Sequence, residues 1–166
     1  ADAVHGAEIC RDLQDRLVMI ARVSDAGAFV NTNALTLKRS HGDYSVMQLL
    51  YDGSEIKAVL DFVNAGEVPI AWELIRSYSY MDCTFNAARL AAYTNEYRRY
   101  AEVSMDDLRY MPYLYLGQLL SSTYGYKQYL QTGDEELLAF GRWRTEMCRY
   151  LIANAGEVSA ELVRLA

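Results

Sequence analysis

Apolar residues recur at helical spacing over most of the chain. Residues 7–23 place Ile9, Leu13, Leu17 and Ile20 on one stripe, which predicts an amphipathic helix with that stripe buried. The segments that follow residue 69 show the same spacing and predict further helices. Their expected apolar faces consist of Ala71, Leu74, Ile75 and Tyr78, then Leu90, Tyr93, Tyr97 and Tyr100, then Leu137, Phe140, Met147 and Leu151, and finally Val158, Leu162 and Leu165.

Prolines, glycines and capping residues indicate where these helices begin and end. Pro69 suits a first helical position, where the N–H that proline lacks would be unpaired anyway. Ser104 and Asp107 have the spacing of a capping box. Pro112 is expected to break or kink its helix, and Gly156 to separate a long helix from a short last one.

One segment departs from helical spacing. The apolar runs 49–51 and 56–60 flank Asp52-Gly53, and Asp-Gly favours a tight hairpin turn because both central positions need positive φ. This pattern predicts a β-hairpin at about residues 48–60, and the rest of the chain shows no other convincing strand signal. The expected fold class is therefore mainly α, with one inserted hairpin.

Aspartates flank the predicted hairpin, Asp43 before it and Asp61 after it. Because a hairpin holds its ends together, the two carboxylates should be neighbours. One could orient and deprotonate a hydroxyl, and the other could bind Mg²⁺ together with the amide oxygen of Gln48. Such a set suits phosphoryl transfer. Spacing alone also fits turn and cap aspartates of a solvated hairpin, with His41 as a structural imidazole that bonds the loop backbone.

Composition narrows the choice of partners and compartment. The chain has 166 residues, which predicts a single domain, and a formal net charge of −6, which disfavours nucleic acid and anionic membranes as partners. Cys10, Cys83 and Cys148 form no CxxC pair and are expected to be reduced thiols of a cytoplasmic protein. No apolar stretch reaches the roughly 18 residues that a membrane span needs.

The run from His41 to Gly53, followed by residues 56–62, resembles the catalytic block of aminoglycoside phosphotransferases and their homoserine kinase-like, choline kinase-like and spore-coat kinase relatives. Their pattern is HGDxxxxN, a hairpin, and an aspartate at the end of the second strand. Residues 69–74 look like the helix start that follows in this family, with acidic Glu73 before Leu74. The resemblance implies the C-terminal lobe of a protein kinase-like fold. It also implies transfer of the γ-phosphoryl group of Mg-ATP to a hydroxyl of a small molecule, such as an aminoglycoside or an amino alcohol.

The same resemblance assigns roles to individual residues. Asp43 would be the catalytic base or hydroxyl-orienting carboxylate, Asp61 the principal Mg²⁺ ligand and His41 a structural residue of the catalytic loop. Gln48 stands where the family has asparagine, and Ser45 where many members have histidine. These departures leave three hypotheses open. The chain could belong to an active kinase, to a catalytically silent kinase-like binding module, or to a helical interaction domain whose aspartates are structural.

No segment resembles the Gly-rich phosphate loop, strand lysine and helix glutamate of the lobe that clamps the nucleotide. We therefore expect residues 1–166 to be the C-terminal lobe without that partner lobe, and to have no appreciable kinase activity alone. An apolar surface near Leu49, Leu50, Phe62 and the first helix would then be uncovered, which predicts a homodimer. The alternative is that residues 28–40 fold over this surface and keep the chain monomeric. Tyr93, Tyr97 and Tyr100 are expected to be core and interface residues rather than a cage for the substrate.

Overall fold

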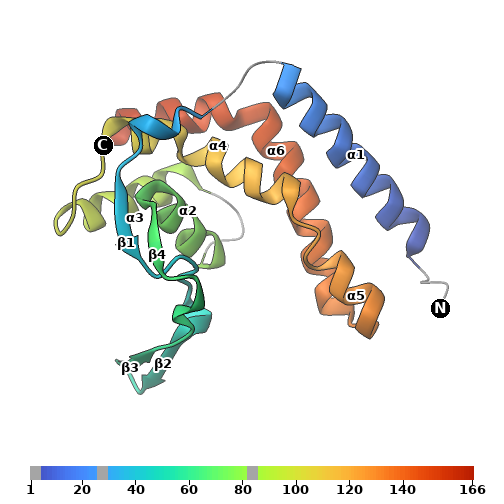
Figure 1. The fold of residues 1–166 in the computed structure, drawn as a ribbon, viewed down its shortest axis with the longest axis horizontal. Coiled ribbons are helices and arrows are strands. Elements are labelled where there is room, and N and C mark those ends of the chain that lie inside the picture. The colour runs from blue at the N-terminus through green and yellow to red at the C-terminus, as the bar shows by residue number, and fades with distance from the viewer. Residues whose placement is uncertain (1–4, 26–29, 82–85) are drawn as a thin grey trace. The chain divides into compact units, whose positions relative to one another are not determined.

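The computed structural model describes residues 5–25, 30–81 and 86–166. They are mainly helical, with six α-helices and two small sheets in the described part (Figure 1). The helices are α1 (Gly6–Asp25), α2 (Ile70–Met81), α3 (Ala87–Arg98), α4 (Met105–Ser121), α5 (Tyr126–Thr132) and α6 (Glu135–Leu165). The strands are β1 (Leu37–Ser40), β2 (Leu49–Asp52), β3 (Glu55–Val59) and β4 (Gly66–Pro69), and single 3₁₀ turns are η1 (Thr32–Ala34), η2 (Val46–Gln48) and η3 (Phe62–Asn64).

The chain divides into two compact units. Unit 1 combines Ala1–Val30 with Leu116–Ala155, and unit 2 combines Asn31–Tyr115 with Gly156–Ala166. Both sheets and helices α2 and α3 belong to unit 2. None of the helices in the described ranges is both long enough and apolar enough to cross a membrane.

The predicted hairpin is confirmed. Strands β2 and β3 pair antiparallel from Leu49 opposite Val59 to Asp52 opposite Glu55. Gly53 has a φ of 61°, a conformation that glycine adopts without steric cost. The position of the hairpin therefore agrees with the prediction, but its turn differs: Asp52 pairs with Glu55, so the turn residues are Gly53 and Ser54, and of these only Gly53 has positive φ.

A second sheet was not predicted. Strands β1 and β4 pair antiparallel from Leu37 opposite Pro69 to Ser40 opposite Gly66, and the ladder continues with a bond from Ile70 N to Thr36 O of 2.9 Å. Pro69 thus ends a strand, and the helix starts one residue later than predicted. Proline has no N–H to donate to the neighbouring strand. At the end of a strand this costs at most one hydrogen bond of the ladder, so proline is tolerated there.

The core of unit 2 forms around α2. This helix packs against β1, β4, η2 and α3. Its buried residues Ile70, Ala71, Leu74, Ile75 and Tyr78 include the predicted face, and α3 adds Leu90 and Ala91. Tyr100 was predicted on the apolar face of α3 but is 76% exposed, because the helix already ends at Arg98.

Two helix boundaries differ from the predicted ones. Pro112 lies inside the continuous helix α4, and Gly156 lies inside α6, which runs to Leu165. A proline inside a helix removes one backbone hydrogen bond, and a glycine costs about 1 kcal/mol relative to alanine. Buried side chains in the neighbouring turns, such as Met111 in α4 and Leu151 and Val158 in α6, can offset these costs. The capping box is confirmed: Asp107 N donates to Ser104 Oγ at 3.0 Å, and Ser104 N donates to Asp107 Oδ2 at 2.8 Å.

In unit 1, the buried side of α1 differs from the predicted stripe. Ile9 is buried, but Leu17 is 65% exposed and Ile20 is also exposed, whereas Arg16 is only 2% exposed. The Arg16 guanidinium donates to Thr145 Oγ1 at 3.0 and 2.6 Å and to the carbonyl oxygens of Leu119, Ser122 and Gly141. A buried charge is tolerated when its donors are paired in this way, so the helix turns a polar residue inward.

Candidate active site

Two loops in unit 2 lie between the two strand pairs. The last pair of the β1–β4 ladder is Ser40 with Gly66, and the outer pair of the hairpin is Leu49 with Val59. The first loop (residues 41–48) and the second loop (residues 60–65) therefore leave one ladder together and enter the next together. Figure 1 shows β1 and β4 side by side, with the β2–β3 hairpin continuing beyond them. Asp43 lies on the first loop and Asp61 on the second.

His41 bonds one loop to the other. Its Nε2 donates to the carbonyl oxygen of Leu60 at 2.6 Å, and its Nδ1 accepts from Asp43 N at 3.4 Å. Since a carbonyl can only accept, the neutral tautomer with its proton on Nε2 satisfies both contacts. Leu60 N also donates to the carbonyl oxygen of Gln48 at 2.8 Å. The buried imidazole thus links the first loop to the second by hydrogen bonds.

Glu73 of α2 fixes the backbone on both sides of Asp43. Gly42 N donates to its Oε2 at 2.8 Å, and Tyr44 N donates to its Oε1 at 2.9 Å. Glu73 is buried, so these charge-assisted bonds are shielded from water. The sequence marked Glu73 only as an acidic residue at a helix start, and its contact with the first loop became visible only in three dimensions.

Arg76 of α2 holds the side chain of Asp43. The distance from Arg76 Nη2 to Asp43 Oδ1 is 2.5 Å, and the two side chains are 16% and 27% exposed. Arg76 follows Glu73 by one helical turn, so both residues face the same loop. Helix α2 therefore fixes both the backbone and the carboxylate of Asp43. Nothing in the sequence pattern indicated this role of Arg76.

The amide oxygen of Gln48 is engaged inside the first loop. The hydroxyl of buried Ser45 donates to Gln48 Oε1 in a short hydrogen bond, and Ser45 Oγ accepts from Met47 N at 3.2 Å. An amide oxygen has two acceptor sites, so one remains after this bond. The longer side chain that replaces the expected asparagine is thus matched to Ser45.

Asp61 adopts a strained backbone conformation. Its φ of 61° and ψ of 59° lie in the left-handed region, and among the described residues it is the one non-glycine residue with positive φ. Such a conformation costs about 1 kcal/mol or more and is often found at functional sites. The Asp61 side chain is exposed and forms no hydrogen bond or ion pair with another described residue.

The sequence matches a known protein family. A model of the phosphotransferase enzyme family matches residues 8–103, which is more than half of the chain and includes both loops and all four strands. The chain belongs to the phosphotransferase enzyme family. The resemblance seen in the His-Gly-Asp block is thereby confirmed. Neither the search of curated proteins nor the search of solved structures found a match.

Asp61 and Gln48, the two residues predicted to bind a metal ion, lie on the second and the first loop and carry side-chain oxygens. The exposed carboxylate of Asp61 and the remaining acceptor site of Gln48 are ligands of the type that Mg²⁺ prefers. No group of three or more His, Cys, Asp or Glu side chains that could hold a metal occurs in the part of the chain that the structure describes.

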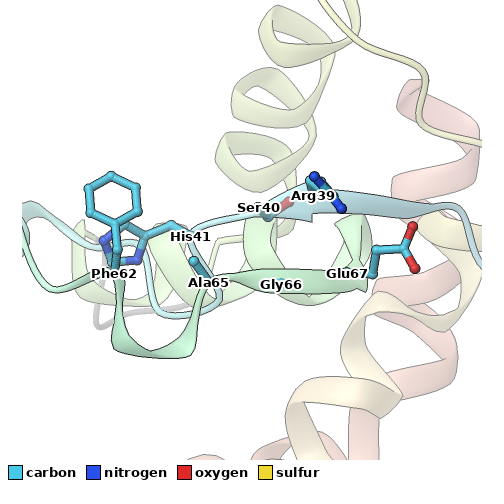
Figure 2. A pocket seen from close by; sticks show the side chains of 7 residues that line it. All are labelled: Arg39, Ser40, His41, Phe62, Ala65, Gly66 and Glu67. Carbon is cyan, nitrogen blue, oxygen red and sulfur yellow. The ribbon is translucent and has the colours of Figure 1, made fainter.

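A pocket of about 720 Å³ opens beside the loops. Figure 2 shows the rings of His41 and Phe62 at one end and the charged residues Arg39 and Glu67, from β1 and β4, at the other. The ring centroids of His41 and Phe62 are 4.7 Å apart. Neither Asp43 nor Asp61 lines this pocket, but His41 and Phe62, their close neighbours on the two loops, do.

Half-buried tyrosines surround Glu73 near the first loop. Burial raises the pKa of Tyr44, and the neighbouring Tyr93, Tyr51 and Glu73 raise it further. Burial also raises the pKa of Tyr97, again with contributions from Glu73 and Tyr93. Tyr93 OH lies 2.8 Å from Ser77 Oγ. Tyr44 and Tyr97 therefore keep their phenolic protons at ordinary pH and can donate hydrogen bonds in the neighbourhood of Glu73.

Proposed function

We propose that this phosphotransferase transfers the γ-phosphoryl group of Mg-ATP to a hydroxyl of a small molecule. The observation that supports this most directly is the double hold on Asp43. Glu73 bonds the amides on either side of it, and Arg76 bonds its carboxylate. Phosphoryl transfer depends mainly on positioning and charge neutralisation, so a fixed carboxylate beside the acceptor is its central protein requirement.

In this proposal, Asp43 accepts a hydrogen bond from the acceptor hydroxyl, orients it and takes its proton as the new bond forms. Asp61 and Gln48 would hold Mg²⁺, which in the bound state neutralises phosphate charge. His41 keeps the two loops in register through its bond to Leu60 O. The left-handed backbone of Asp61 directs its exposed carboxylate without help from a neighbouring side chain.

We further propose that the chain forms the C-terminal lobe of a protein kinase-like fold, and that a separate lobe clamps the nucleotide. The net charge of −6 favours a small-molecule acceptor over nucleic acid or an anionic membrane. The three cysteines are widely spaced in the sequence and form no CxxC pair, which favours reduced thiols and a cytoplasmic protein. An aminoglycoside, an amino alcohol or a similar hydroxyl compound would be a suitable acceptor.

The test is ATP-dependent phosphorylation of a panel of small hydroxyl compounds by the full-length protein, followed as ADP release and as product mass. Asp43→Asn and Asp61→Asn should each lower turnover by about 10²–10⁴-fold, since each removes a carboxylate that the reaction uses. Asp52→Asn, at the exposed hairpin turn, is the matched control and should leave turnover unchanged. Full turnover by Asp43→Asn would refute the proposal.

The second candidate function is a catalytically silent kinase-like binding module. The bond from Ser45 to Gln48 favours it, because it engages an oxygen that a metal ion would use. Wild-type protein that binds Mg-ATP in calorimetry but releases no ADP with any acceptor would support this alternative. Gain of turnover in Gln48→Asn would then identify the glutamine as the cause of silence.

A further inference from the structure

The ion pair between Asp43 and Arg76 differs from most others in the described part of the chain. Pairs such as Arg99 with Glu96 join exposed residues one helical turn apart, and such pairs contribute little to stability. Arg76 and Asp43 instead join a helix to a loop, both are largely shielded from solvent, and the pair is short. A contact of this kind restricts the position of both side chains.

The surroundings of Asp43 create a need for a cation. Glu73 bonds the amides of Gly42 and Tyr44, so a second carboxylate lies beside Asp43. Two neighbouring carboxylates repel each other, more strongly where water is scarce. Arg76 stands one turn further along α2 and supplies the opposite charge. It therefore allows Glu73 to hold the loop without driving Asp43 away.

The geometry also distinguishes the two oxygens of Asp43. Oδ1 is occupied by Arg76 Nη2, which leaves Oδ2 for another partner. A guanidinium has five donors in a rigid plane, so it fixes the direction of a carboxylate in a way that the single ammonium of lysine does not. An acceptor hydroxyl would then meet one oxygen in one orientation.

We propose that Arg76 is a positioning residue of the phosphotransferase: it holds Asp43 Oδ1 so that Oδ2 faces the acceptor hydroxyl. This inference rests on the proposed function. It adds a residue that acts through Asp43 and therefore affects the rate of transfer more than the binding of the acceptor.

The kinetic test compares Arg76→Gln and Arg76→Lys with wild type in the full-length protein, with Arg99→Gln as the matched control on an exposed ion pair. Arg76→Gln should lower kcat about 10–100-fold with little change in the KM for the acceptor, since orientation is lost while binding contacts remain. Arg76→Lys should recover part of the loss, and Arg99→Gln should match wild type. A raised KM with unchanged kcat, or unchanged kinetics, would overturn the inference.

A spectroscopic test is independent of turnover. The ¹H–¹⁵N signals of the Arg76 guanidinium, identified by their loss in Arg76→Lys, should shift in Asp43→Asn and stay in place in Asp52→Asn. Arg76 signals with the same chemical shifts in Asp43→Asn as in wild type would overturn the inference. Wild-type protein without any phosphoryl transfer would refute the proposed function, whereas an active wild type with an equally active Arg76→Gln variant would refute the role of Arg76 alone.

Discussion

Gly42 lies where the two loops approach each other most closely. Its φ is 81°, and a Cβ atom built there would come within 2.1 Å of the carbonyl oxygen of Asn64 on the second loop. Both the backbone conformation and the lack of space therefore require glycine. The contact brings the residue before Asp43 against the loop that carries Asp61.

We predict that Gly42→Ala destabilises the protein more than Gly53→Ala does. Gly53 also has positive φ, but a Cβ atom added there would meet no atom of the described residues within 4 Å, so its substitution should cost only about 1 kcal/mol of backbone strain. Gly42→Ala must in addition displace the backbone of Asn64 and should abolish phosphoryl transfer. Urea unfolding of both variants tests this, and equal losses of stability would contradict it.

At the residue scale, the sequence identified the residues of the motif but not those that hold them. His41, Gly42 and Asp43 stand out because, together with the hairpin and the aspartate after it, they match a family pattern. Arg76 does not, because an arginine on an amphipathic helix is normally solvated and nothing in the pattern shows which loop it faces. Arg16 was missed for the same reason, since its burial depends on carbonyl groups from residues far along the chain.

At the element scale, one side chain connects the start of α4 to the start of β1. Asp107 is fully buried, and its Oδ2 accepts from Ser104 N and Ser104 Oγ, both at 2.8 Å. Its Oδ1 accepts from Thr36 N at 2.9 Å. Because β1 leads into the first loop, the helix cap also holds the strand that positions Asp43.

We predict that Asp107→Asn lowers the free energy of unfolding by about 2–3 kcal/mol. The two carboxylate oxygens accept from Thr36 N, Ser104 N and Ser104 Oγ, and the NH₂ group of asparagine would place a donor opposite one of these donors. Asp134→Asn is the control. Asp134 Oδ1 accepts from Glu136 N at the exposed start of α6, where asparagine caps equally well, so little change is expected. Chemical denaturation measures both variants, and an Asp107→Asn protein as stable as wild type would refute the assigned role.

The elements that the sequence predicted are those defined by local signals. Gly53 indicated the hairpin turn, and Ser104 with Asp107 indicated the start of α4. The β1–β4 sheet was missed because its strands carry polar residues such as Arg39 and Glu67 and lie on either side of the hairpin in the sequence, so no local turn signal joins them. Helix α6 was divided at Gly156 because local rules treat a glycine as an end even where apolar contacts continue on both sides.

At the scale of the whole molecule, the hairpin and its flanking turns expose many large apolar side chains. These lie in the stretch 46–63, which comprises the hairpin and the adjoining parts of the two loops: Val46, Met47, Leu50, Tyr51, Ile56, Leu60, Phe62 and Val63. Apolar side chains gathered in this way usually mark an interaction surface.

We predict that the isolated chain forms a homodimer through this stretch at micromolar concentration. The combined substitution Met47→Lys and Val63→Lys should shift the protein toward monomer, because a charged side chain is costly to bury. Tyr100→Lys, an exposed aromatic residue outside the stretch, is the control and should leave the dimer intact. Sedimentation velocity measures the mass, and a monomeric wild type would refute the prediction.

Helices α4 and α6 each contribute to both compact units, since the unit boundaries fall after Tyr115 and after Ala155. Each unit is therefore assembled from two separate stretches of chain, and no single cut can release either one whole. The last stretch is bonded into unit 2, where Ser159 Oγ donates to Arg109 O at 2.8 Å and Asn95 Nδ2 to Leu165 O at 2.8 Å. Truncation before Asn31 removes α1 from unit 1, and truncation after Ala155 removes Gly156–Ala166 from unit 2, so the chain should resist dissection into autonomous fragments.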